Sequence, residues 1–131
     1  MPSKSGVAKK IKAISLADNI ARITAISNDY GYEYIFETQL AEQSQPEDIV
    51  VLISASGNSK NLINAAYYAK SDGLFSVGVV GLDGGKLKEI CDHVIHVQTI
   101  KGEYGVVEDI HLMFDHLVSE YLINIFKNRE R

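Results

Sequence analysis

The sequence feature that most constrains the fold is an aliphatic run, Ile49 to Ile53, that ends at a serine-rich turn, Ser54 to Ser59. A strand with one face in water alternates apolar and polar residues, and this run does not alternate. It therefore predicts a central strand of a parallel sheet. Because parallel strands need long crossover connections, usually helices, the run also predicts βαβ units.

Strand and helix patterns alternate along the rest of the chain. Together they predict an α/β fold with a parallel sheet and helices on both faces, in a single domain over residues 10–131 that follows a loose leader over 1–9. The other expected strands are 11–16, 75–80 and 94–97, and the expected helices are 20–28, 32–43, 61–71, 86–91 and 106–127.

The bulk composition narrows the function classes. The 131 residues carry a net charge of -4, with basic clusters only near the chain ends, which argues against nucleic-acid binding. The longest apolar run is far short of the roughly 20 residues that span a bilayer, so we expect no membrane partner. A single cysteine, Cys91, cannot form an intrachain disulfide, and we therefore expect a reducing, cytoplasmic setting.

The serine turn is the clearest candidate binding site, because anions bind where a parallel strand ends and the next helix begins. The hydroxyls of Ser54, Ser56 and Ser59 can donate to phosphate oxygens, and the Asn58 amide adds a donor. Gly57 lets the backbone approach a ligand closely. The alternative is structural: Ser59 caps the helix and the other two serines form the turn.

Two other phosphate-binding motifs are missing from the sequence. It contains neither Gly-x-Gly-x-x-Gly nor Gly-x-x-x-x-Gly-Lys-Ser/Thr. The first marks dinucleotide sites and the second marks nucleoside-triphosphate sites. Both ligand classes are therefore disfavoured.

The last predicted helix is apolar on two sides, which indicates burial against both the core and a second subunit. The stripe expected to face the core is Ile110, Met113, Phe114, Leu117, Val118, Tyr121, Leu122 and Ile125. Leu112, Ile123 and Phe126 lie opposite and have Glu108 and His116 among them.

Glu108 and His116 are candidates for catalysis or metal binding. They are eight residues apart and project within roughly 80° of each other, so they could converge on one ligand. Histidine suits metal binding and proton transfer near neutral pH, and glutamate can act as a ligand or a general base. The alternative is a hydrogen-bonded interface histidine and a glutamate favoured by the helix dipole.

Four motifs in order resemble the phosphoheptose isomerase branch of the SIS (sugar isomerase) domain family. They are Ile26–Glu33, Ser54–Ser59, Asp83–Leu87, and Glu108–His111 with His116. The resemblance implies a Rossmann-like three-layer sandwich that assembles as dimers or tetramers through the C-terminal helix. It also implies that the turn serines hold a sugar phosphate and that Asn28 and Asp29 lie at the sugar.

The resemblance further implies an activity, the conversion of sedoheptulose 7-phosphate to an aldose heptose phosphate. A histidine matching His116 acts there and can bind zinc. Its partner in the family is a glutamine, and this sequence has Glu108 instead. The swap adds negative charge, which could strengthen cation binding or mark a different substrate.

The sequence departs from the family by lacking the N-terminal helix, the first strand, the Gly-Asn-Gly-Gly-Ser loop and the helix that carries the glutamate base. We therefore expect an exposed sheet edge or apolar face. Three hypotheses stay open: a sugar-phosphate isomerase whose base comes from elsewhere, a non-catalytic sugar-phosphate-binding or regulatory module, and a truncated product without an independent role.

Overall fold

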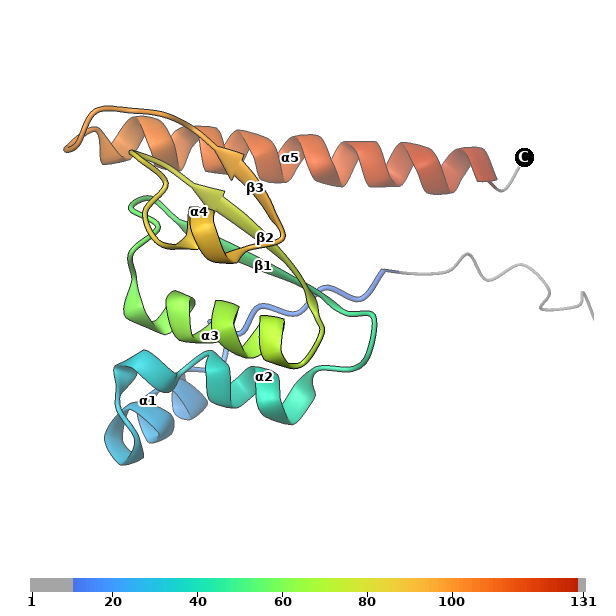
Figure 1. Cartoon of the computed structure of the whole chain (residues 1–131). Helices are drawn as coiled ribbons and strands as arrows, with labels where there is room; N and C mark the ends of the chain where they lie inside the picture. The colour runs from blue at the N-terminus through green and yellow to red at the C-terminus, as the bar shows by residue number, and fades with distance from the viewer. Residues whose placement is uncertain (1–10, 130–131) are drawn as a thin grey trace, which may run out of the picture.

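The structure is a computed structural model that describes residues 11–129, with side chains described as far as residue 126. The expected leader over 1–9 lies outside the described residues. Three parallel strands form one sheet in the order β1-β2-β3 (Figure 1). The strands are β1 Ile49–Ser54, β2 Phe75–Val80 and β3 His93–His96.

Helices cover the sheet on both sides (Figure 1). Helices α3 and α4 pack on one face, α5 runs along the other, and α2 and the 3-10 turn η1 lie against the outer side of α3. This arrangement confirms the expected α/β sandwich. The helices are α1 Ile20–Asp29, η1 Tyr32–Tyr34, α2 Glu37–Gln43, α3 Lys60–Ser71, α4 Leu87–Ile90 and α5 Tyr104–Arg129.

The core lies between the sheet and α3. Leu52 of β1 is buried there, and Ala65, Ala66 and Ala69 are fully buried on the facing side of α3. Alanine side chains let a helix approach a sheet closely, and they leave the aliphatic side chains of the strands to fill the interface. This packing places the start of α3 directly beyond the end of β1.

Strand β1 differs from its prediction. It was expected to be central, but within residues 11–129 it is an edge strand, paired only with β2. Val50 and Leu52 are buried, whereas Ile49, Val51 and Ile53 are exposed. An apolar run shows that neither face favours water, but it does not show which elements cover the second face. Within residues 11–129, the sheet therefore has the expected exposed edge and exposed apolar face.

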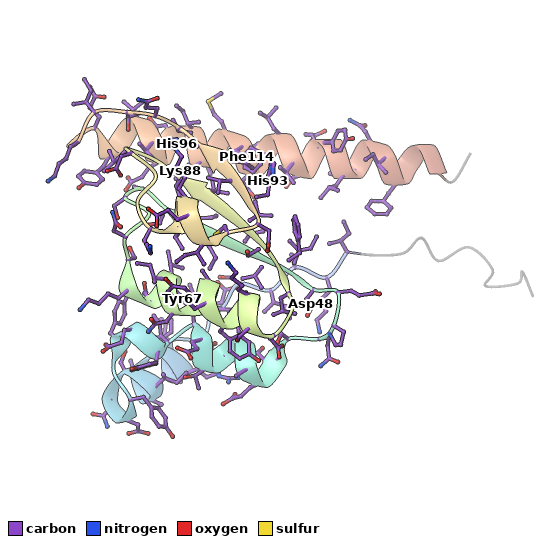
Figure 2. The ribbon with its side chains drawn as sticks, in the orientation of Figure 1. Asp48, Tyr67, Lys88, His93, His96 and Phe114 are labelled. Carbon is purple, nitrogen blue, oxygen red and sulfur yellow. The ribbon has the colours of Figure 1, made fainter. Side chains whose placement is uncertain are left out.

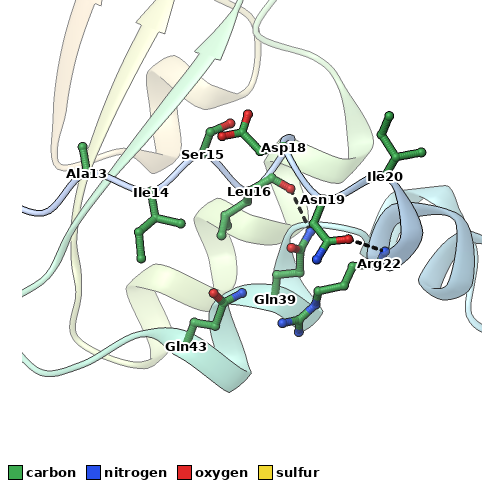
Figure 3. A pocket seen from close by; sticks show the side chains of 10 residues that line it. All are labelled: Ala13, Ile14, Ser15, Leu16, Asp18, Asn19, Ile20, Arg22, Gln39 and Gln43. Carbon is green, nitrogen blue, oxygen red and sulfur yellow. Dashed lines mark hydrogen bonds between the residues drawn. The ribbon is translucent and has the colours of Figure 1, made fainter.

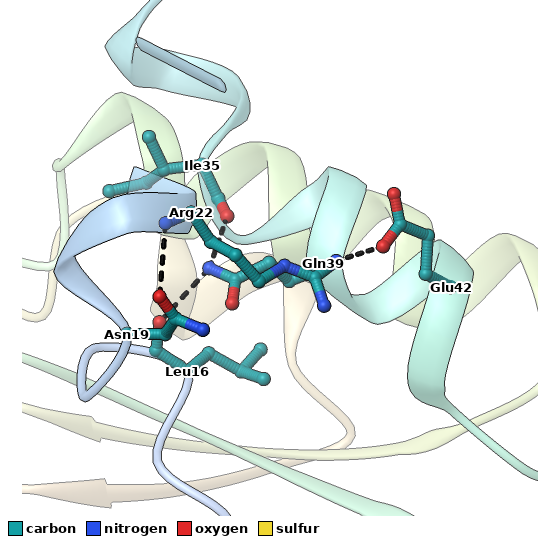
Figure 4. A network of polar contacts seen from close by, with 6 residues as sticks. All are labelled: Leu16, Asn19, Arg22, Ile35, Gln39 and Glu42. Carbon is teal, nitrogen blue, oxygen red and sulfur yellow. Dashed lines mark hydrogen bonds and ion pairs between the residues drawn. The ribbon is translucent and has the colours of Figure 1, made fainter. Parts of the chain in front are cut away.

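The segment before α1 is not the strand expected over 11–16. Residues 11–15 have no regular structure, and Leu16 instead packs on the core. The Gln39 side-chain amide fixes this segment by donating to the Leu16 carbonyl at 3.0 Å and to the Ile35 carbonyl at 2.8 Å (Figures 3 and 4). An alternating pattern cannot form a strand without a neighbouring strand to accept its hydrogen bonds.

Helix α1 begins as the sequence indicates. The Asn19 side chain accepts a hydrogen bond from the backbone N–H of Arg22 at 3.1 Å and so caps the helix, and Arg22 pairs with Glu42 of α2 (Figure 4). The helix expected over 32–43 is instead split into η1 and α2. Gly31 lies between α1 and η1, and its φ of 114° is not helical, so it separates those two elements. Ile35, between η1 and α2, is buried in the core.

Helix α5 forms as predicted, but its contact face is rotated. Val107 is fully buried, and His111, Phe114 and Leu122 are half-buried, with Phe114 on the sheet side of α5 in Figure 2. Five of the eight residues in the stripe expected to face the core are exposed, namely Ile110, Met113, Leu117, Val118 and Tyr121. No helix within residues 11–129 is both long and apolar enough to cross a membrane.

Candidate functional site

The serine turn lies where β1 meets α3. Ser54 is the last residue of β1 and is buried, and Ser59 is the N-cap position of α3. The Ser54 hydroxyl oxygen accepts a hydrogen bond from the Gly57 N–H at 3.0 Å and lies 3.4 Å from the Ser59 hydroxyl. The Ser56 hydroxyl oxygen accepts one from the Asn58 N–H at 3.2 Å. The structure thus gathers the three predicted serines into one turn.

The hydrogen bonds of the turn leave donors available. Ser54 and Ser56 use an oxygen lone pair to accept from the backbone, so their hydroxyl protons can point to a ligand. The Ser59 side chain makes no capping hydrogen bond to α3 within the described chain. The first N–H groups of α3 and the positive end of its dipole therefore face the same space, which suits an anion. The uncapped Ser59 weakens the alternative in which Ser59 only caps the helix.

A second turn, residues 83–86, packs against the serine turn; we call it the glycine turn. Its Lys86 N–H donates to the Asn58 side-chain oxygen at 3.0 Å, and the Leu87 N–H donates to the Gly57 carbonyl at 3.0 Å. The Asn58 amide nitrogen donates in turn to the Ser56 carbonyl at 3.1 Å. Both polar atoms of the Asn58 side chain are therefore already bonded to the protein.

Positive side chains that the sequence did not single out lie next to these turns. Lys86 pairs with Glu89, and hydrogen bonding to that carboxylate raises the pKa of the Lys86 amine. His96 Nε2 lies 2.9 Å from the Leu82 carbonyl, and His96 Nδ1 lies 3.3 Å from Lys88 Nζ, near each other in Figure 2. The carbonyl can only accept, so His96 carries its proton on Nε2 and accepts from Lys88 through Nδ1.

The position of Lys86 and Lys88 beside the serine turn could have been inferred from a parallel sheet. The carboxyl ends of β1 and β2 meet at the same edge of the sheet, so the loop after β2 must lie beside the serine turn. Lys86 and Lys88 follow that loop within a few residues. An open cleft beside both turns is lined by Asn58, Asp83, Gly85, Lys86, Lys88 and Glu89.

The predicted sugar-contacting pair lies at the end of α1. Asn28 and Asp29 are exposed and bonded to each other, with Asn28 Nδ2 donating to Asp29 Oδ1 at 3.1 Å. Within residues 11–129, no hydrogen bond joins them to the serine turn. The following segment is fixed to α3, because the Asn64 amide donates to the Glu33 carbonyl at 3.1 Å. The sugar-contacting role stays a prediction.

Glu108 and His116 are both exposed on α5. Eight residues of helix separate them by about 12 Å along the axis. Within the described range, no group of three or more His, Cys, Asp or Glu side chains could hold a metal ion. Catalytic zinc takes three protein ligands, so these two residues alone do not complete a zinc site.

His111 is a half-buried residue of α5. Its Nε2 atom is buried and has no hydrogen-bond partner in the described structure. The rotated contact face of α5 explains its burial, because His111 is one helical turn after the buried Val107.

Comparison with known proteins finds relatives that match most of this chain. A phosphoheptose isomerase from Fusobacterium nucleatum subsp. nucleatum is 41% identical over 112 residues, and one from Maridesulfovibrio salexigens is 37% identical over 116 residues. Each alignment covers 86% of this chain and 56% of the relative. The chain therefore spans about half the length of the curated relatives it matches.

Solved structures agree with this comparison. A phosphoheptose isomerase from Neisseria gonorrhoeae superposes with a TM-score of 0.74 at 29% identity, over 79% of this chain and 58% of that one. A phosphoheptose isomerase from Francisella tularensis gives 0.75 at 27% identity, over 82% and 56%. The SIS domain family matches residues 8–115. Since that match spans most of the sequence, the chain belongs to the SIS domain family.

Proposed function

We propose that this chain is the sugar-phosphate-binding part of a phosphoheptose isomerase, acting on a ketose or aldose heptose phosphate such as sedoheptulose 7-phosphate. The observation that carries the proposal is the serine turn. Three hydroxyls gather at the start of an α3 helix whose N-cap side chain makes no capping bond within the described chain. The names of the relatives support a heptose phosphate as the ligand.

In this proposal the chain holds and orients the substrate. Ser54, Ser56 and Ser59 donate to the phosphate oxygens, and the backbone of Gly57 lets the phosphate approach. Isomerisation moves a proton between adjacent carbons, and a positioned acid or base lowers the barrier to that transfer. His116 carries out proton transfer, and Glu108 lies about two turns earlier on α5. A further base, the glutamate of the family, comes from a segment that this chain does not match.

Binding is the first test of the proposal. Isothermal titration with sedoheptulose 7-phosphate should show one saturable site, and a ligand at a hundred times its dissociation constant should add about 2.7 kcal/mol to the free energy of unfolding. Ser56→Ala should weaken the affinity. Ser71→Ala is the matched control, because it removes a serine hydroxyl at the opposite end of α3. Equal affinity in both variants would refute the proposed site.

Turnover is the second test, and it separates two candidate functions. A non-catalytic sugar-phosphate-binding or regulatory module is the second candidate function. Incubation with sedoheptulose 7-phosphate, with and without zinc, tests for isomerase activity. Product above the buffer rate would rule out the non-catalytic module, whereas binding without product would rule out isomerase activity of this chain by itself.

Three further parts of the proposal concern a metal ion, the oligomeric state and the location in the cell. We propose that a zinc ion, where one is bound, takes Glu108 and His116 as two of its ligands and its remaining ligands from outside this chain. We propose a homo-oligomer formed through α5, whose exposed apolar side chains support an interface. We also propose a cytoplasmic location, supported by the single, half-buried Cys91.

A further inference from the structure

The glycine turn and the serine turn are joined by hydrogen bonds and by close backbone contacts. From this fit we infer that Asn58 is a positioning residue: together with the glycine turn it holds the serine turn in its binding shape and does not itself contact the phosphate. The inference rests on the proposed sugar-phosphate site. It also assigns a task to the Asp83-Gly84-Gly85-Lys86 sequence, which the proposed function leaves without one.

Asn58 fixes Ser56 from two sides. The Asn58 N–H donates to the Ser56 hydroxyl at 3.2 Å, and the Asn58 side-chain nitrogen donates to the Ser56 carbonyl at 3.1 Å. The Asn58 side-chain oxygen accepts from the Lys86 N–H at 3.0 Å. The side chain thus connects Ser56 to the glycine turn through both its nitrogen and its oxygen.

Backbone hydrogen bonds reinforce this connection. The Leu87 N–H donates to the Gly57 carbonyl at 3.0 Å, directly after the glycine turn. The Gly81 N–H donates to the Ala55 carbonyl at 3.0 Å, at the end of β2. The serine turn is therefore bonded to the second loop at three positions, 55, 57 and 58.

The backbones of the two turns also lie too close to leave room for a side chain at Gly57 or Gly85. A Cβ on Gly57 would lie 2.0 Å from the Gly84 carbonyl oxygen, and a Cβ on Gly85 would lie 2.3 Å from the Ser56 carbonyl oxygen. Both glycines also have positive φ, 64° and 52°. Only glycine allows two backbones to meet this closely in these conformations. A side chain at either position would push the turns apart and displace the hydroxyls.

Two substitutions break this fit in different ways, and one control isolates the effect. Asn58→Ala removes the side-chain bonds. Gly85→Ala keeps asparagine at position 58 but introduces a Cβ that would lie 2.3 Å from the Ser56 carbonyl oxygen and 2.6 Å from the Asn58 side-chain nitrogen. Gly73→Ala is the matched control: Gly73 has a φ of 72°, and a Cβ added there would meet nothing within 4 Å. It imposes similar backbone strain at the far end of α3 without touching either turn.

The readouts are the affinity for sedoheptulose 7-phosphate by titration calorimetry, and amide hydrogen exchange by NMR, both at a temperature where every variant is folded. We expect Asn58→Ala and Gly85→Ala to bind about tenfold more weakly, the effect of losing one to two hydrogen bonds, and Gly73→Ala to bind like the parent. The Leu87 amide, which does not bond to the Asn58 side chain, should exchange faster in both site variants.

The outcomes separate the inference from the function on which it rests. If the parent binds no sugar phosphate, the proposed function fails, and faster Leu87 exchange in Asn58→Ala still supports the positioning role. Unchanged Leu87 exchange with weaker binding would overturn the inference and make Asn58 a direct ligand. Equal loss of affinity in Gly73→Ala would also overturn it, because general strain would then explain the effect.

Discussion

Asp92 and Ser76 are joined by three hydrogen bonds between the loop before β3 and the start of β2. The Asp92 carboxylate accepts from the Ser76 N–H at 2.8 Å and from the Ser76 hydroxyl at 2.7 Å, and the Asp92 N–H donates to the Ser76 hydroxyl oxygen at 3.1 Å. The bonds to Ser76 hold the pKa of the Asp92 carboxyl below its ordinary value of 3.8. Charged Asp92 therefore stabilises the folded chain.

The first prediction is a pH-dependent contribution of Asp92 to stability. Because the folded pKa is lowered, the contribution is fully present above pH 3.8 and is lost as the pH falls through the lower folded pKa. The parent should be more stable than Asp92→Ala at pH 6, and the difference should shrink by pH 3. Urea unfolding at several pH values measures it.

A control variant tests whether the charge is responsible for that effect. Asp92→Asn keeps an oxygen acceptor for Ser76 but does not titrate, so its stability relative to Asp92→Ala should not change between pH 6 and pH 3. A parent-to-Ala difference that stays constant over the same range would contradict the role assigned to the carboxylate.

The second prediction compares neighbouring valines on β1. Val50 is 8% exposed and faces the core, whereas Val51 is 55% exposed on the opposite face. Both substitutions to alanine lose the same strand preference, but only Val50→Ala also leaves a cavity. We expect Val50→Ala to lower the free energy of unfolding by about 1.5 kcal/mol more than Val51→Ala. Equal losses in urea unfolding would show that the Val51 face is covered in solution.

The same strand shows what sequence can and cannot determine. The aliphatic run predicted a strand at 49–53, and β1 forms at Ile49–Ser54. Its place in the sheet could not be read from the run, because burial of the second face depends on elements far away in sequence. Strand β2 was predicted with its observed bounds, Phe75–Val80, since its flanking turn signals are local.

One part of the candidate site could be predicted from the sequence, and another part could not. The serine turn was predictable because its donors are contiguous in sequence and follow a strand. The contact between Gly57 and Gly84 was not, since it joins residues 27 positions apart and depends on the register of β1 with β2. Helix α5 has two apolar sides, so more than one orientation about its axis would bury apolar side chains. Only the tertiary packing decides that Val107 is the residue that faces the sheet.

The third prediction concerns how α5 docks on the sheet. A Cβ on Gly81 would lie 2.4 Å from a Val107 methyl group and 2.8 Å from the Ala55 carbonyl oxygen. Gly81→Ala should therefore destabilise the chain by displacing α5, and Val107→Ala should cost about 2 kcal/mol through a cavity. The double variant should lose about 1 kcal/mol less free energy of unfolding than the sum of the two single losses.

The measurement for this pair is a double-mutant cycle by urea unfolding. Additive losses would mean that Val107 does not provide the clash, leaving the Ala55 carbonyl as its source. Val118→Ala combined with Gly81→Ala is a suitable control, because Val118 lies three helical turns farther along α5 and should give additive losses.

The fourth prediction tests assembly through α5. Ile110, Met113, Leu117 and Tyr121 form one exposed stripe on the helix, and Leu117 is 65% exposed. If this stripe is the proposed interface, Leu117→Glu places an unpaired charge in an apolar contact and should reduce the molar mass measured by light scattering to that of a single chain. Ser119→Glu adds the same charge to the same helix but about 160° away, so it should leave the oligomer intact.

A parent that is already monomeric, or equal effects of the two glutamates, would rule out this stripe as the contact. A smaller mass for Leu117→Glu alone, with unchanged helical circular dichroism, would place the interface on the stripe.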